Sequence, residues 1–94
     1  MLGWMTTALD IRRKRLLFRS WHRGTSEVDL LLGSFAERHL DRLSEAQLQR
    51  YEALLENDDN SLFAWIAGRD PPPAEHDSDV LRMLIDFRFH PGCA

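Results

Sequence analysis

Residues 19–35, RSWHRGTSEVDLLLGSF, contain the end of one predicted helix and the start of another. Gly24 ends the first helix, because glycine adopts the left-handed conformation after a helix at no steric cost. Thr25 or Ser26 caps the second helix, since a side-chain oxygen there accepts a hydrogen bond from a free backbone N–H. Glu27 is favourably placed at the positive end of the same helix. The stretch therefore predicts two helices joined by a tight turn.

The segments on both sides of this turn carry the apolar spacing of amphipathic helices. An irregular apolar stripe predicts a first helix over residues 7–21, with Thr6 or Thr7 as its cap. Regular spacing at i, i+3, i+4 and i+7 predicts a second helix over residues 26–43. Gly33 inside that helix costs about 1 kcal/mol relative to alanine, so we expect another helix to pack closely against it. The stripes are formed by Leu9, Leu16, Leu17 and Trp21, with Ile11 and Phe18 beside them, and by Val28, Leu31, Leu32, Phe35, His39 and Leu43.

The middle of the chain predicts two shorter helices. A capping box at residues 44–47, SEAQ, opens a helix over 45–56. The polar run NDDN at residues 57–60 breaks the chain, and a helix over 61–67 follows and ends at Gly68. The apolar residues that these two helices are expected to bury are Leu48, Tyr51, Leu54, Leu55, Leu62, Trp65 and Ile66.

A proline-rich segment precedes the last helix. The prolines within residues 69–76 cannot continue a helix, so we expect an extended linker there. A fifth helix is predicted over residues 78–88, with Val80, Leu81, Leu84 and Ile85 facing inward.

The length of 94 residues suits one domain with a single modest core. Short connections between amphipathic helices predict an all-α fold, a small five-helix bundle in a single domain over residues 1–94. Residues 1–6 and 89–94 are expected to be flexible ends.

The single cysteine, Cys93, gives no disulfide framework within the chain. The apolar runs are far shorter than a bilayer span, and the start, MLGWMTTALD, lacks the pattern of a secretory signal. We therefore expect a protein of the bacterial cytoplasm that does not insert into a membrane. The mitochondrial matrix is the less favoured compartment.

Few side chains are arranged for catalysis or metal binding. The histidines His22, His39, His76 and His90 are not paired at helical spacing, whereas a zinc site needs three or four converging ligands. The adjacent acids at residues 58–59 suit the start of a helix better than acid–base chemistry. The serines lack the context of a nucleophile, and the glycines do not form a phosphate-binding loop. We therefore expect no enzymatic activity and no catalytic, cofactor or metal site.

The charge is unevenly distributed along the chain. Residues 1–23 carry a net charge of +5 and the remainder −8, within a formal total of −3. A basic helix on an acidic body fits three interpretations: the solvated side of an amphipathic helix, a contact to an acidic protein, or binding of nucleic acid or lipid. The next helix is apolar and flanked by acids, which disfavours base recognition.

Arg23 is the residue that a helix boundary leaves unexplained. Its guanidinium can make a forked contact to a carboxylate or phosphate that lysine cannot reproduce. Glu27 either holds that guanidinium in place or accepts a hydrogen bond from an arginine of a partner. Gly24 offers backbone without a side chain, which suits close approach by another polypeptide. The pattern leaves open both a simple helix boundary and a docking surface.

Residues 22–35, HRGTSEVDLLLGSF, resemble the Arg-Gly-x-x-Glu signature of the SdhE-like FAD assembly factors. These are small helical proteins that help to attach FAD covalently to the flavoprotein subunit of succinate dehydrogenase. The similarity continues through residues 40–68 and covers about residues 12–68, while the proline linker and last helix fit only in type. The signature is specific when it is coupled to the later run LLENDDNSLFAW.

The resemblance implies a partner-binding site at the turn. Many relatives have a second arginine where His22 stands and a bulky apolar residue where Thr25 stands, and these departures bear on how tightly the client is held. The positions with an implied partner-binding role are His22, Arg23, Gly24, Glu27 and Asp29.

The resemblance further implies an assembly factor rather than an enzyme. It would dock on the flavoprotein subunit of succinate dehydrogenase, with fumarate reductase as a second client, and promote covalent FAD attachment. The client would hold the FAD, so the factor needs no cofactor of its own, and it is expected to be a monomer that binds no nucleic acid. The alternatives are a small nucleic-acid-binding protein acting through its basic helix and an antitoxin-like regulator.

Overall fold

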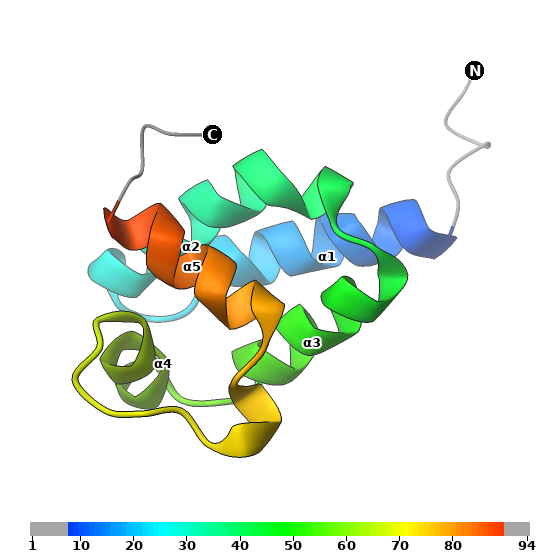
Figure 1. The fold of residues 1–94 in the computed structure, drawn as a ribbon. Coiled ribbons are helices and arrows are strands. Elements are labelled where there is room, and N and C mark those ends of the chain that lie inside the picture. Colours follow the sequence, from blue (N-terminus) through cyan, green and yellow to red (C-terminus); the bar gives the residue numbers. More distant parts are fainter. Residues whose placement is uncertain (1–7, 90–94) are drawn as a thin grey trace.

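A computed structural model describes residues 8–89, which form five α-helices and two short 3₁₀ segments (Figure 1). No strand occurs in this part of the chain, and the predicted all-α, five-helix fold is confirmed. The predicted caps Thr6 and Thr7 and the predicted flexible ends, apart from Phe89, lie outside the described residues. The helices are α1 (Ala8–Trp21), α2 (Ser26–His39), α3 (Glu45–Leu55), α4 (Asp59–Ile66) and α5 (Asp79–Phe89), and the 3₁₀ segments are η2 (Leu40–Arg42) and η3 (Ala74–His76).

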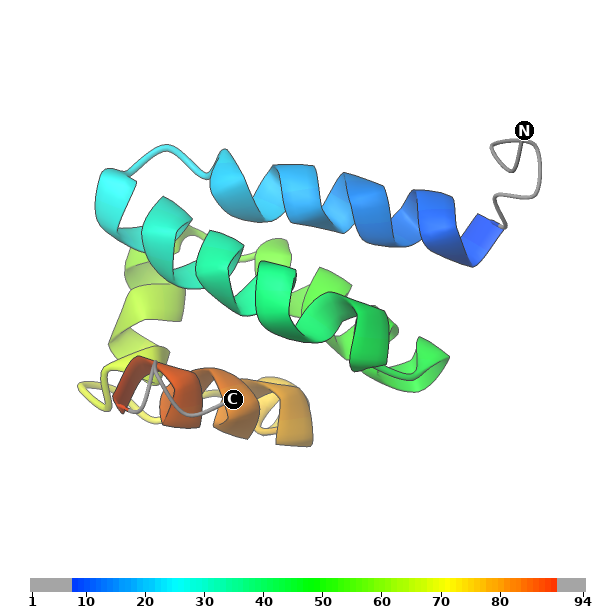
Figure 2. The same cartoon turned by 90° about the horizontal axis from the view of Figure 1, so that it is seen from above.

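Helix α2 lies at the centre of the bundle. Figure 2 shows α1 alongside α2, running the opposite way, and α5 on the other side of α2. Helix α3 contacts both α1 and α5, and α4 packs against α5. The apolar faces of all five helices therefore meet in one core, whose buried members are Leu16, Val28, Leu32, Phe35, Ala36, Leu40, Leu43, Leu48, Tyr51, Leu54, Leu55, Leu62, Ile66, Val80, Leu81, Leu84 and Phe87.

Phe35 is the aromatic centre of this core. Its ring centroid lies 4.8 Å from that of His39, 5.7 Å from Tyr51 and 5.8 Å from Phe87. His39 is partly buried, as expected for a residue at the core boundary, and this burial lowers its pKa. Phe87 is a core residue that the sequence prediction missed, while Ile85, predicted to face inward, is only partly buried.

The close helix contact expected at Gly33 is present. The indole ring of Trp21, at the end of α1, covers Gly33, and a Cβ atom added there would overlap the ring. The absence of a side chain thus lets α1 pack directly on the backbone of α2, which accounts for a glycine inside the helix.

Helix α2 ends earlier than predicted, because the chain tightens into η2 after His39. A 3₁₀ turn brings residues i and i+3 to the same side, and Leu40 and Leu43 are both buried. The carbonyl oxygens of these two residues accept hydrogen bonds from Arg13 at 2.9 and 2.8 Å. The side chain of Arg13 therefore replaces the partners that a continuing α-helix would have provided.

The starts of α3 and α4 are set by side-chain caps. The predicted capping box of Ser44 and Gln47 is present at α3. Helix α4 begins earlier than predicted, because Asp58 is its cap and accepts hydrogen bonds from the hydroxyl of Ser61 at 2.8 Å and from its backbone N–H at 3.1 Å. These hydrogen bonds, the hydroxyl one first, lower the pKa of Asp58.

The proline-rich segment is not extended throughout, since Ala74–His76 form a 3₁₀ turn. His76 hydrogen-bonds Asn57 at 3.1 Å and stacks on Trp65 with ring centroids 5.5 Å apart. Trp65, which the sequence predicts to be buried with its neighbours Leu62 and Ile66, is therefore only partly buried. Its ring stacks on His76 of this segment and packs against the core from outside.

Ser20 and Tyr51 form a polar pair inside the core. The Ser20 hydroxyl donates to the carbonyl oxygen of Leu16 at 2.7 Å and lies 2.6 Å from the Tyr51 hydroxyl. Because the single Ser20 proton is used on that carbonyl, Tyr51 donates to Ser20. Both residues are fully buried, and burial raises the pKa of Tyr51 from its ordinary value of 10.0 to about 12.

We expect this tyrosine to make the protein sensitive to alkali. Well below pH 10.0, Tyr51 is neutral in both the folded and the unfolded chain. Between pH 10.0 and about pH 12, it ionises in the unfolded chain but not in the folded one. Stability is thus lost as the pH rises through this window, by roughly 2–3 kcal/mol. Urea unfolding at increasing pH measures the loss, and Tyr51→Phe should flatten the curve. Tyr51 is the only tyrosine, so tyrosinate absorbance that appears at pH 10 in the folded protein would contradict the prediction.

Candidate partner-binding site

The turn between α1 and α2 is held by backbone geometry and by one carboxylate. Gly24 has a φ angle of +128°, a conformation that favours glycine. Thr25 occupies the cap position of α2, but its side chain makes no capping hydrogen bond. Instead, Asp29 accepts hydrogen bonds from the backbone N–H groups of Arg23 at 2.6 Å and of Gly24 at 3.2 Å. The predicted hydroxyl cap is therefore replaced by an aspartate from the first turn of the helix.

The side chain of Arg23 points into the protein. Its Nε donates to Asp59 at 2.9 Å, and its two terminal nitrogens donate to the carbonyl oxygens of Leu55 and Asn57. Only 11% of this side chain is exposed. The interpretation that Glu27 holds the guanidinium is thus wrong. Arg23 instead ties the α1–α2 turn to the end of α3 and the start of α4, and in this arrangement its forked donors face the chain's own oxygens.

Three of the five predicted partner-binding residues remain at the surface. Gly24 is exposed, and a Cβ atom added to it would meet only the carboxylate of Asp59, at 3.6 Å. Glu27 is exposed and has no hydrogen bond or ion pair to any residue of the described range. His22 stacks on Phe18 with ring centroids 4.0 Å apart. The structure therefore gathers all five residues at one turn and divides them: Arg23 and Asp29 hold the turn, while His22, Gly24 and Glu27 face outward.

The basic residues of α1 mostly contact the chain itself. Two nitrogens of Arg12 donate to the carboxylate of Glu52, which lowers the pKa of that acid. Arg19 forms an ion pair with Glu56 at 2.9 Å. Together with the contacts of Arg13 and Arg23, these bonds join the basic helix to the acidic body. Much of the positive charge on which the nucleic-acid interpretation depends is thus engaged within the bundle.

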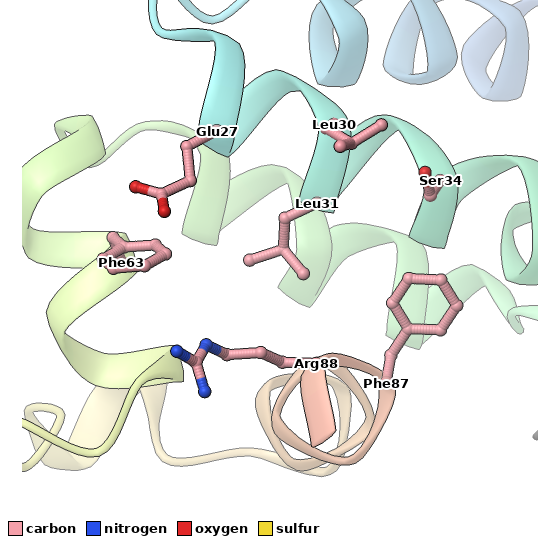
Figure 3. Close-up of a pocket in the computed structure, with 7 residues that line it drawn as sticks. All are labelled: Glu27, Leu30, Leu31, Ser34, Phe63, Phe87 and Arg88. Atoms are coloured by element: carbon pink, nitrogen blue, oxygen red, sulfur yellow. The ribbon is translucent and has the colours of Figure 1, made fainter. Parts of the chain in front are cut away.

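An apolar groove of about 410 Å³ begins at the same turn and runs between α2, α4 and α5 (Figure 3). Glu27 forms part of both the turn and the groove. The sequence prediction missed the groove, because its walls come from three helices. The one available signal was Leu30, an apolar residue outside the predicted stripe of its helix. The lining residues are Glu27, Leu30, Leu31, Ser34, Phe63, Phe87 and Arg88.

Metal binding and membrane insertion find no support within residues 8–89. No cluster of three or more His, Cys, Asp or Glu residues in this range could hold a metal ion. None of the helices described here combines the length and the apolar character needed to cross a bilayer. His90 and Cys93 lie outside this range.

The fold and the site together define a class of protein: a small helical bundle, with most arginines of its first helix bonded within the chain, that presents a glycine turn and an adjoining apolar groove. Residues 14–88 match the family model described as the flavinator of succinate dehydrogenase. The chain belongs to this family, and the resemblance stated from the sequence is confirmed. The match also includes the proline segment and most of α5, which the resemblance covered only in type.

Curated relatives agree with this family. The chain is 41% identical over 85 residues to the FAD assembly factor SdhE of Acetobacter pasteurianus, covering 89% of this chain and 78% of the relative. It is 43% identical over 72 residues to succinate dehydrogenase assembly factor 2, mitochondrial, of Dictyostelium discoideum, covering 77% and 51%. The protein of the same name from Danio rerio is 39% identical over 82 residues, covering 85% and 52%. The chain thus spans about half the length of these mitochondrial relatives.

Proposed function

We propose that this protein binds the flavoprotein subunit of succinate dehydrogenase and promotes covalent attachment of FAD to that subunit. The observation that carries the proposal is the division of roles at the α1–α2 turn. Arg23 and Asp29 fix the turn from inside, and Gly24 and Glu27 are exposed on it. A fixed turn loses little conformational freedom on binding, which favours recognition by another protein. The names of the relatives mention succinate dehydrogenase and FAD, so the proposal is limited to that client.

In this proposal the client and its flavin supply the covalent chemistry. The assembly factor docks through Gly24 and Glu27 and holds the client in a conformation where FAD and a histidine of the client lie close together. Restricting the relative motion of two reacting groups contributes several kcal/mol to lowering a barrier of this kind. The factor provides no nucleophile, carries no cofactor and acts transiently as a monomer.

Flavin loading of the client tests the proposal directly. The apo flavoprotein subunit is expressed with and without this protein, and covalent flavin is scored by its fluorescence after denaturation. We expect loading to be high with the protein and low without it, and the two proteins to co-purify before FAD is attached. Equal loading in both samples would show that the proposed function is wrong.

Glu27 should matter for binding and not for folding. Because its carboxylate has no partner within the described chain, Glu27→Ala should weaken binding to the apo subunit by roughly fivefold to tenfold. Glu45→Ala is the matched control, since Glu45 is also an exposed acid in the first turn of a helix. Both changes should lower stability by less than about 1 kcal/mol through the helix dipole. Calorimetric titration measures the affinities, and equal binding by the two variants would exclude a contact at Glu27.

A further inference from the structure

The groove beside the turn has an apolar floor and two charged side chains, Glu27 and Arg88, in its lining. Figure 3 shows Leu31 pointing into it from α2, with Phe63 of α4 on one side and Phe87 of α5 on the other. Its volume of about 410 Å³ is enough for one or two bulky side chains. Phe87 is 6% exposed, so the floor is continuous with the core and is a firm surface.

Leu30 makes the rim of this groove unusual. Its side chain is 63% exposed, although it is a large apolar group on the central helix. Leu30 and the apolar floor together form one contiguous surface, and apolar surfaces of this kind mark contact sites for other molecules. A partner that covered Leu30 would shield from water the most exposed large hydrophobic side chain of the described residues.

The charged side chains that line the groove indicate what it accepts. At the end next to the turn, Glu27 has no internal hydrogen bond or ion pair in the described range. The guanidinium of Arg88, which comes from α5, lies at this same end, over the ring of Phe63 and 5.7 Å from its centroid (Figure 3). The groove therefore offers an available carboxylate beside an apolar floor. The complementary group is a bulky apolar side chain with a lysine or arginine beside it.

We propose that this groove receives a bulky apolar side chain of the flavoprotein subunit, flanked by a basic residue that pairs with Glu27. The inference rests on the proposed function and extends its contact surface from the α1–α2 turn along α2 to α5. We assign the groove and the α1–α2 turn to the same partner because the two surfaces are continuous, with Glu27 belonging to both. The turn would thus fix the position of the client, and the groove would supply apolar contact area.

Two charge insertions at exposed apolar positions test the groove. Leu30→Glu places a carboxylate on its rim, whereas Ile11→Glu does the same on α1, where Ile11 is 43% exposed and far from the turn in sequence. We expect Leu30→Glu to weaken binding to the apo subunit by about tenfold or more and Ile11→Glu to leave it unchanged. Leu30→Met should bind normally. All three should melt at the wild-type temperature, since both positions are exposed.

The outcomes separate the groove from the proposed function. If the wild-type protein loads the client and Leu30→Glu binds as tightly as Ile11→Glu, the groove assignment is wrong and the proposed function stands. If the wild-type protein neither binds the subunit nor raises flavin loading, both are wrong. If Leu30→Glu converts a dimer of this protein into a monomer in light scattering, the groove contacts a second copy. If a variant ending at Phe89 binds an apolar dye, Leu30→Glu abolishes this binding, and the full chain binds no dye, the occupant is the chain's own C-terminal segment. Either of these last results overturns the assignment to the client.

Discussion

Gly24→Arg should abolish covalent flavin loading of the client, whereas Gly24→Ala should cost the same stability and retain most of the loading. The φ angle of +128° at this residue is unfavourable for any side chain, so each variant should lose about 1–2 kcal/mol. A Cβ atom meets only Asp59, at the ordinary contact distance of 3.6 Å, so no clash is added to this strain. The two variants therefore share the backbone cost and differ in the bulk that they present to a partner.

Urea unfolding and flavin fluorescence together separate the two effects. Because an arginine at this position could pair with Asp59, Gly24→Gln supplies an uncharged long side chain for comparison. We expect all three variants to unfold at similar urea concentrations, while loading falls from alanine to glutamine and arginine. Complete loss of loading already with alanine, at equal stability, would mean that the client requires the backbone conformation of the turn. Normal loading with arginine would remove Gly24 from the contact surface.

Arg23→Ala should lower the free energy of unfolding by about 3 kcal/mol, because removing one partner of a largely buried ion pair leaves the other uncompensated. The side chains of Arg23 and Asp59 are only 11% and 18% exposed. The carbonyl oxygens of Leu55 and Asn57 would lose hydrogen bonds to a charged donor as well. For a small domain with a total stability of roughly 5–15 kcal/mol, such a loss is a large fraction.

Two further variants define the role of this arginine. Arg23→Lys should recover only part of the lost stability, since an ammonium group lacks the fork that reaches three acceptors. Arg19→Ala is the surface control. The side chains of Arg19 and Glu56 are 41% and 72% exposed, so removing their ion pair should cost no more than about 1 kcal/mol. Urea unfolding measures the loss of stability in each variant, and we expect the dependence of the unfolding free energy on urea concentration to stay unchanged. If Arg23→Ala keeps its stability and still loses client binding, Arg23 is a contact residue and not an internal tie.

The local features of this fold could be read from short stretches of sequence. The capping box at Ser44 and the turn at Gly24 depend on residues a few positions apart, and both are present in the structure. The close contact at Gly33 was also predicted, because a glycine inside an apolar helix needs a packing reason. The missed start of α4 also had a local cause, the cap Asp58, whereas the error at the end of α2 came from a long-range partner. Arg13 holds the carbonyl oxygens of Leu40 and Leu43, just after α2, although it lies on another helix.

The candidate site was located by sequence but not understood from it. The position of the turn and its five residues followed from the pattern and the resemblance. The pattern could not decide whether Arg23 contacts a partner or its own chain, because Asp59 is 36 positions away. Nor could it predict the groove, whose lining comes from α2, α4 and α5.

The sequence by itself determined five amphipathic helices, the glycine turn between the first two and the family of the chain, because these depend on local backbone preferences, apolar spacing and short motifs. Only the tertiary structure decided that Arg23 and Asp29 face inward and that Glu27 and Leu30 face outward. The physical reason is that ion pairs and grooves form between side chains brought together by packing, and their partners are set by distance in space and not by spacing along the chain.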